Sequence, residues 1–275
     1  MKIAYKLGYM ALALMIWGGV SFTPAEAAYK PKLSDNMGGS FKKDVQGVVA
    51  YLKSLPKPAR WTFMAEYLGV LYMAADGASG HTEKGGIDDG ARFVGIDGRE
   101  YDASGELKAV RVKGGWSEWE KNKFAIERLG RDAVFAKMSS EVTALVLANA
   151  KFHLKKMAES DPVLRDMCLA NIAGLCYMPD GEKANAEVAE WNDPGRFKQV
   201  IRSYSYPGSK FVDAEGAEHD YDDVYAKLTS RCGHRWNILQ LCNHYVGKKD
   251  ILSIFPDDVK KLRANYEKKM KELKG

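Results

Sequence analysis

The stretch GHRWNIL, at residues 233–239, combines a histidine, an arginine and an asparagine with apolar residues. The chain holds only five histidines, and this one lies between Cys232 and Cys242. In a helix, residues three positions apart share a face, so Asn237 is expected beside His234. The stretch therefore predicts either the start of a helix or part of a polar site.

Apolar residues recur at helical spacing over most of the remaining chain. The windows that show this spacing are 41–52, 61–75, 116–129 and 134–147. Further helix starts are expected at Asp161-Pro162 and at Pro256, because proline favours the first helical position. A weak alternation at 107–112 predicts one short strand, and no internal repeat is expected. The pattern indicates an α+β fold that is mainly α.

The first 27 residues have the form of a secretory signal peptide. Lys2 and Lys6 precede an uncharged apolar run at 7–20, and small residues at positions 25 and 27 provide a cleavage site. We expect cleavage near Ala27, with residues 28–275 forming a single periplasmic or secreted domain. No later segment is apolar enough to predict a transmembrane helix in the mature chain.

The charge pattern excludes one class of partner. The formal net charge is +5, and basic residues alternate with acidic ones except at the C-terminus. A nucleic-acid-binding surface would need clustered cations on one face. We therefore expect no nucleic-acid partner.

Four cysteines in an exported chain predict two disulfides. Of the three possible pairings we favour the local one, Cys168 with Cys176 and Cys232 with Cys242, which closes two short loops. The alternative is a zinc site built from two Cys-x-His pairs, although structural zinc sites usually have tighter cysteine spacing. Its ligands would be Cys232, His234, Cys242 and His244.

A glycine-rich segment at 77–105 separates the helical regions. Long loops in compact domains are often functional, so this one is a candidate site wall. His81 lies near its start. Its acidic residues suggest a weaker alternative, a calcium loop, because calcium prefers oxygen ligands. The carboxylates concerned are Asp88, Asp89 and Asp97.

Two short windows resemble the CAP superfamily (cysteine-rich secretory, antigen 5 and pathogenesis-related proteins). The segment SGHT at 79–82, followed by glycines, aspartates and Arg92, is similar to the first signature of the family. GHRWNIL is similar to the second signature of bacterial and protist members. The resemblance implies a CAP-like α/β/α core with a long helical insertion at 106–220 and an additional C-terminal helix.

The same resemblance implies a cleft centred on His81 and His234, with Glu106 as acidic partner. These three residues are then the candidates for catalysis, and the two histidines are candidate metal ligands. Arg235 and Asn237 would orient His234 or a bound ligand. The implied function is binding of a polar small molecule or a divalent metal, zinc or calcium, at the cell envelope. The identity of the cofactor and whether the site is catalytic remain open.

Two other functions remain open. Many cell-wall glycosidases are helical, exported and built around a carboxylic acid at a cleft, and Glu66 is the candidate acid for a peptidoglycan hydrolase. The other is a non-enzymatic, disulfide-stapled binding or scaffold protein whose exposed aromatic residues line a groove for a cell-wall carbohydrate or a lipid. The aromatic residues concerned are Trp116, Trp119, Trp191, Tyr204 and Tyr206.

Overall fold

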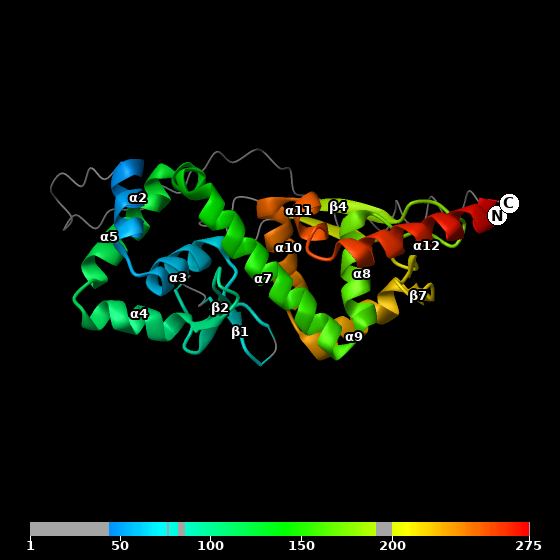
Figure 1. Ribbon diagram of the computed structural model, residues 1–275, viewed down its shortest axis with the longest axis horizontal. Coiled ribbons are helices and arrows are strands. Elements are labelled where there is room, and N and C mark those ends of the chain that lie inside the picture. Colours follow the sequence, from blue (N-terminus) through cyan, green and yellow to red (C-terminus); the bar gives the residue numbers. More distant parts are fainter. Residues whose placement is uncertain (1–43, 76, 82–85, 191–199, 275) are drawn as a thin grey trace, which may run out of the picture. The chain divides into compact units, whose positions relative to one another are not determined.

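The computed structural model describes residues 44–75, 77–81, 86–190 and 200–274 (Figure 1). Helices dominate this part of the chain and are joined by small antiparallel sheets, so the prediction of an α+β, mainly α, fold is confirmed. These residues belong to one compact unit. None of their helices has the length and apolar character needed to cross a membrane. The predicted signal peptide lies outside the described residues.

The first half of the fold begins with α2 (Val45–Ser54) and ends with the long helix α7. Between them a helix leads into a three-stranded sheet, and further helices follow. In order these elements are α3 (Lys57–Leu68), β1 (Tyr72–Met73), β2 (Ala91–Val94), β3 (Glu100–Asp102), α4 (Ala103–Val112), α5 (Trp116–Leu129), α6 (Arg131–Phe135), the 3-10 turn η2 (Ala136–Met138) and α7 (Ser139–Ser160). The strand predicted at 107–112 is wrong, because these residues continue α4, which Asp102 caps by accepting from Gly105 N.

The second half repeats this order of elements. They are α8 (Pro162–Ala173), β4 (Asn185–Glu190), β5 (Val200–Ser205), β6 (Lys210–Val212), β7 (Glu218–Asp220), α9 (Tyr221–Cys232), α10 (Arg235–Val246), α11 (Lys248–Leu252) and α12 (Pro256–Lys274). The β4–β5 hairpin has no counterpart in the described residues of the first half. The predicted helix starts at Asp161-Pro162 and Pro256 are confirmed.

The two halves also repeat in sequence, which the sequence-based expectation of no internal repeat missed. Residues 90–102 read GARFVGIDGREYD and residues 208–220 read GSKFVDAEGAEHD, with six identities in these 13 positions. The strand registers match as well. Phe93 faces Tyr101 in β2–β3, and Phe211 faces His219 in β6–β7. In both hairpins the two facing rings stack, with centroids 5.5 and 5.3 Å apart.

The turn that follows the first helix of each half is the same. Gly69 and Gly174 both adopt the left-handed conformation that ends a helix, with φ of 71° and 73°. Three residues later Tyr72 and Tyr177 take matching positions. The Tyr72 hydroxyl donates to Glu100 at 2.6 Å, and the Tyr177 hydroxyl donates to Glu218 at 2.8 Å. Each tyrosine thereby joins the helix end to the hairpin.

An ion pair repeats between the first and last helix of each half. Arg60 of α3 bonds Glu141 of α7 at 2.9 Å, and Arg165 of α8 lies 3.3 Å from Asp258 of α12. Glu141 and Asp258 are each the third residue of their helix. We therefore describe the fold as two repeated units, unit 1 (residues 57–160) and unit 2 (residues 162–274).

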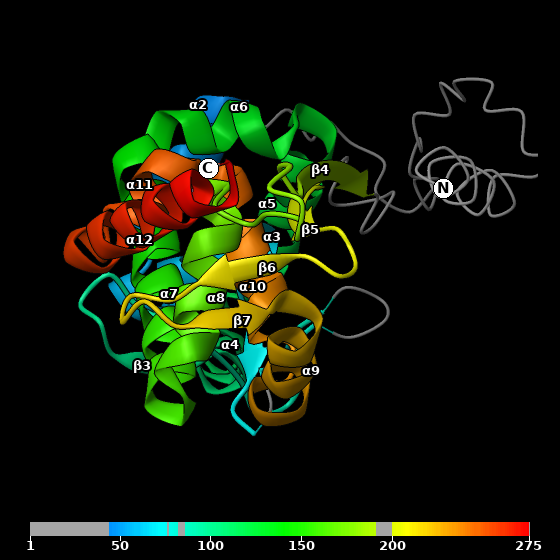
Figure 2. The ribbon, with the colours of Figure 1, turned by 90° about the vertical axis from the view of Figure 1, so that its right-hand side faces the viewer.

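Helix α7 belongs to both units. Its N-terminal half packs on unit 1, where Asn149 bonds both the backbone N–H and the carbonyl of Val94. Its C-terminal half packs on α8 and α10 of unit 2. There the Cys168 thiol contacts the sulfur of Met157 at 3.5 Å. Figure 1 shows α7 running between the α3 region and the α8–α10 region, and Figure 2 shows the molecule from the side on which α12 and the β6–β7 hairpin lie.

Candidate functional site

The two predicted histidines lie on elements that approach each other. His81 is half-buried, and its backbone pairs with Ile87 in an isolated antiparallel bridge. His234 is exposed at the N-terminal end of α10, where the Asn237 amide lies 3.3 Å from its Nδ1. The predicted role of Asn237 in orienting His234 stays a prediction.

Arg235 joins the start of α10 to the turn that precedes His81. Its guanidinium lies 3.4 Å from the carbonyl oxygen of Ala74. The backbone of Gly77 lies so close to the Arg235 side chain that an added Cβ would overlap it. The structure therefore brings Ala74 and Gly77 into contact with Arg235, the first residue of α10.

The Arg235 guanidinium is enclosed by aromatic rings. It lies 5.7 Å from the ring centroid of Tyr72 and 5.9 Å from that of Phe152, which are cation–π distances. Nη1 lies 3.2 Å from Nδ1 of His153. The residue is 9% exposed, and no described carboxylate forms an ion pair with it. A nearly buried cation is thus held by rings, an imidazole and a carbonyl.

His153 is the buried partner that sequence reasoning missed. Burial, and secondarily the charge of Arg235, lower the pKa of its imidazole from 6.5 to about 3. It therefore stays neutral and accepts from the guanidinium through Nδ1. One signal was available, because His153 falls on the apolar stripe of α7 with Val146, Ala150 and Met157.

Glu106, the predicted acidic partner, lies in the first turn of α4 and is half-buried. Burial raises the pKa of its carboxyl group, and the charge of Asp102 adds to this, while Lys113 opposes it. The adjoining Ser104 hydroxyl accepts from the backbone N–H of Gly90, and Lys108 bonds Asp89 at 2.7 Å. These bonds attach the first half of α4 to residues 89–90 of the glycine-rich segment.

The predicted metal sites are wrong. Among the described residues no group of three or more histidine, cysteine, aspartate or glutamate side chains is arranged to hold an ion. This result removes zinc or calcium at His81 and His234, the Cys-x-His set, and the calcium loop. The loop carboxylates have other partners, since Asp89 binds Lys108 while Asp97 accepts from the Tyr101 hydroxyl at 2.7 Å.

The predicted disulfides are also wrong, because all four cysteines are free and buried. They are Cys168, Cys176, Cys232 and Cys242. Three of them lie in helices and Cys176 follows α8, and each serves as a small apolar core residue. Burial raises the pKa of the Cys176 thiol to about 11 and that of Cys242 further. These thiols are therefore poor nucleophiles and poor ligands.

Glu66, the candidate glycosidase acid, is 1% exposed in the last turn of α3. Its Oε1 lies 2.6 Å from Nζ of Lys123, whose own side chain is 13% exposed. The sequence held a signal for this pair, since Lys123 falls between Trp119 and Ile126 on the buried face of α5. Its counterpart in unit 2, three residues before Gly174, is Asn171, also 1% exposed.

The described members of the candidate aromatic set have different surroundings. Trp119 is fully buried and packs edge-on against Phe63, with centroids 4.7 Å apart. Trp116 instead stacks under the guanidinium of Arg111. Tyr206 is 47% exposed. Trp191 and the side chain of Tyr204 lie outside the described residues.

Comparison of the chain with protein-family models, with curated proteins and with solved structures finds no match. Functional inference therefore rests on the chemistry of the residues and on the internal duplication.

Proposed function

We propose that the protein is a non-catalytic binding protein built from two repeated helical units. The observation that carries this proposal is that the two units share their structural contacts but differ in their buried ionisable residues. Both units have the helix-end glycine, the tyrosine–glutamate bond and the inter-helix ion pair. The buried ionisable pair of unit 1, Glu66 with Lys123, is not repeated, because Asn171 replaces the glutamate.

The surroundings of the candidate catalytic groups support this proposal. A general acid must come within hydrogen-bond reach of its substrate, and Glu66 is buried behind Lys123. Asn171 has no acidic proton to give. The four cysteine thiols are also buried, so a substrate does not reach them. The two units thus repeat their packing but not the ionisable groups inside it.

A cell-wall lysis assay tests this proposal. Purified protein is added to peptidoglycan, and turbidity is followed beside a known lysozyme as positive control. We expect no loss of turbidity from the wild type. Loss of turbidity that Glu66→Gln abolishes, in a variant with unchanged circular dichroism, would establish the glycosidase function and overturn the proposal.

Export is part of the proposal and rests on residues 1–27. The full chain is expressed in a bacterium, and the periplasmic and cytoplasmic fractions are analysed by mass spectrometry. We expect periplasmic protein with a new N-terminus near Ala28. Full-length protein confined to the cytoplasm would contradict export.

A second candidate function is binding of a small anionic ligand where the 74–77 turn meets α10. The specific observation is the nearly buried guanidinium of Arg235, which has no described carboxylate partner. Exposed His234 precedes it in the chain, and half-buried Asn237 contacts His234. This is the small-ligand cleft implied by the CAP resemblance, without a metal. We expect millimolar phosphate or citrate to raise the melting temperature of the wild type but not of His234→Ala; equal shifts would exclude this ligand site.

A further inference from the structure

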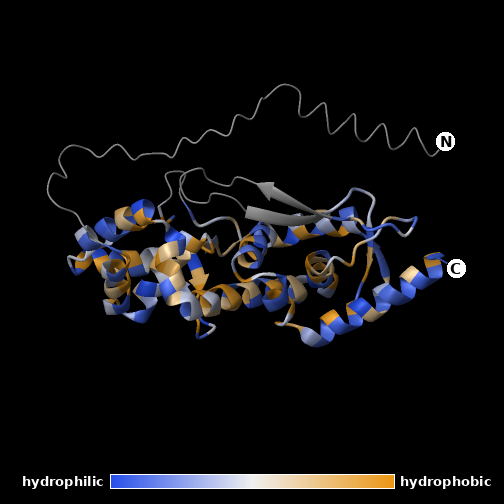
Figure 3. Cartoon of the chain, turned by 90° about the horizontal axis from the view of Figure 1, so that it is seen from above, coloured by the Kyte–Doolittle hydropathy of each residue, from blue (hydrophilic) through white to orange (hydrophobic). Residues whose placement is uncertain are grey.

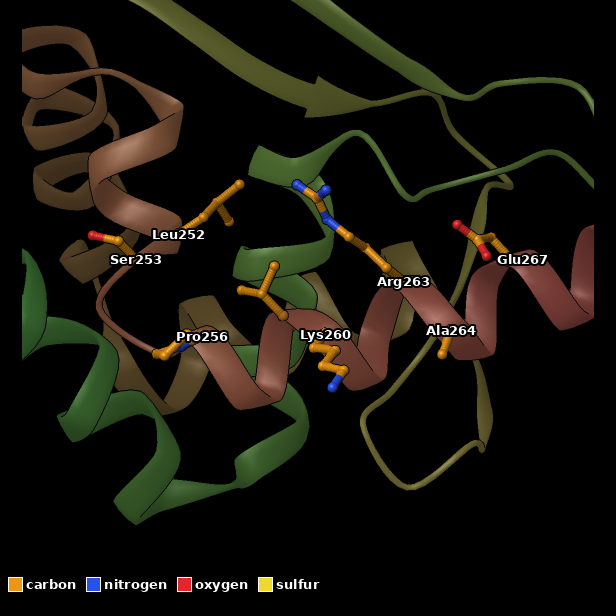
Figure 4. A pocket seen from close by; sticks show the side chains of 8 residues that line it. Leu252, Ser253, Pro256, Lys260, Arg263, Ala264 and Glu267 are labelled. Carbon is orange, nitrogen blue, oxygen red and sulfur yellow. The ribbon is translucent and has the colours of Figure 1, made fainter.

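A groove lies between the last two helices of unit 2 (Figure 4). Its volume is about 550 Å³, and it is open to solvent. The lining residues are Leu252, Ser253, Pro256, Val259, Lys260, Arg263, Ala264 and Glu267. Figure 4 shows the Arg263 side chain extending above α12 toward Leu252. The groove therefore has an apolar floor and a charged rim.

The internal duplication identifies the corresponding place in unit 1. α6 and α11 are both five-residue helices, and each is followed after a short turn by a long helix, α7 or α12. The ion pairs Arg60–Glu141 and Arg165–Asp258 fix the register of these long helices. The α11–α12 groove thus corresponds to the angle between α6 and α7.

In unit 1 this place is filled by a helix. α10 packs against α7 more extensively than any other helix of the described chain does. At its start Arg235 lies beside His153 near the end of α7. Toward its C-terminus the ring of Tyr245 lies 5.1 Å from the guanidinium of Arg131, at the start of α6. α10 therefore runs back along α7 to α6.

The α6–α7 angle of unit 1 is lined by buried apolar side chains, whereas the α11–α12 groove of unit 2 carries exposed charged ones. Val146 and Ala150 of α7 are fully buried. In the register of the ion pairs their counterparts in α12 are Arg263 and Glu267, which are both exposed. Figure 3 shows the helix that ends at the C-terminus as mostly hydrophilic. A partner for this groove must accordingly match charge as well as apolar shape.

The charge of the rim indicates the chemistry of that partner. Two other cations of α12 have acidic partners, since Lys269 binds Glu218 at 2.6 Å and Lys261 lies 3.6 Å from Glu215. No described carboxylate forms an ion pair with Lys260 or Arg263, the two cations of the groove. A partner with carboxylates at this rim would complete both pairs.

We propose that the α11–α12 groove binds an amphipathic helix with acidic side chains, supplied by a partner protein. This inference rests on the proposed binding function and names its partner class. The partner helix takes the position that α10 takes against α6 and α7. Its apolar side contacts Val259, Leu252 and Ala264, and its carboxylates pair with Lys260 and Arg263.

Stapled peptides based on α10 serve as probes, because a 12-residue helix is marginal in water by itself. The acidic probe carries Arg235→Glu and Gln240→Glu, and the basic probe carries Arg235→Lys and Gln240→Lys. Both are labelled, and binding to the full-length protein is measured by fluorescence anisotropy. We expect the acidic probe to bind about tenfold more tightly than the basic one, with an affinity that falls as salt rises.

Charge-reversal variants of the protein test whether the probes bind in the α11–α12 groove. Lys260→Glu with Arg263→Glu should invert the preference between the probes. Lys227→Glu with Lys268→Glu makes the same change in net charge on exposed faces outside the groove and should leave the preference unchanged. Circular dichroism confirms that both variants are folded.

Two results would overturn the inference. One is a probe affinity that does not depend on peptide charge or on the groove variants. The other is concentration-dependent dimerisation in sedimentation that Lys260→Glu with Arg263→Glu removes, since the groove would then bind a second copy. Neither result bears on wall lysis, so failure here is distinct from failure of the proposed non-catalytic function.

Discussion

Unit 1 and unit 2 share a frame and differ in the polar residues buried inside it. Unit 1 joins α3 to α5 through the Glu66–Lys123 ion pair. In unit 2 the Asn171 amide at the matching position donates to the Ser205 hydroxyl at 3.0 Å and lies 3.2 Å from the Tyr221 hydroxyl. One architecture thus tolerates either a charged pair or a neutral network. We infer that the fold of each unit depends on the shared glycines, aromatic residues and helix-to-helix ion pairs, and not on the identity of the buried polar residues.

The largest expected loss of stability is at the two buried tryptophans. Comparing these losses tests whether the two units contribute equally to stability. Trp119→Ala in α5 and Trp236→Ala in α10 should each lower the free energy of unfolding by about 3–5 kcal/mol, because each leaves a large cavity. Urea denaturation followed by circular dichroism measures both. Trp116→Ala, at a partly exposed site, is the control and should cost less than about 1 kcal/mol. A small loss for one buried tryptophan alone would break the equivalence.

The next effect concerns the buried pair that distinguishes the units. Glu66→Ala leaves the Lys123 ammonium without its carboxylate and should cost about 3 kcal/mol. The double variant Glu66→Asn with Lys123→Gln introduces neutral side chains like those of unit 2 and should recover most of that loss. Urea denaturation of the single and double variants provides the comparison. A double variant as unstable as Glu66→Ala would show that the charged pair is required by unit 1.

A pH effect is expected where the units meet. The folded pKa of His153 is about 3, whereas an unfolded histidine titrates near 6.5. Below pH 6.5 only the unfolded chain binds the proton, so stability falls as pH falls, by about 2 kcal/mol between pH 7 and pH 5. His153→Asn keeps an acceptor but does not titrate, and it should flatten this part of the stability–pH curve. Identical slopes for the two proteins would contradict the assignment.

The smallest effect is at the matched tyrosines. Tyr72→Phe and Tyr177→Phe each remove a hydroxyl that donates to a glutamate at 2.6 or 2.8 Å. Each substitution should cost about 1 kcal/mol, and the two losses should agree, because both glutamates are partly in solvent. Thermal unfolding measures both variants. If only one of the two variants lost stability, the tyrosine–glutamate hydrogen bond would contribute unequally to the two units.

Sequence reasoning reached the helical fold class and several helix starts, because apolar periodicity and the Asp161-Pro162 cap are local signals. It missed the duplication, whose identities are scattered and interrupted by the β4–β5 hairpin in unit 2 only. It also placed 107–112 in a strand, although Asp102 caps a helix there.

The grouping of His81 with His234 stays a prediction. The structure shows that Arg235 contacts Ala74 and Gly77, which precede His81 in the chain. The disulfide prediction failed because the number of cysteines and the compartment say nothing about the distance between them, and all four thiols are buried without forming a bond. His153 was missed because burial of a histidine depends on the partner helix α10, which lies far along the sequence.

Helix α7 has a consequence for the order in which the chain assembles. Its first half bonds α3 and β2 of unit 1 through Glu141 and Asn149. Its second half contacts unit 2, where His153 and Met157 lie against Arg235 and Cys168. Because α10 also covers α7, a chain in which α10 has not yet folded exposes the apolar stripe of α7 to any neighbouring chain.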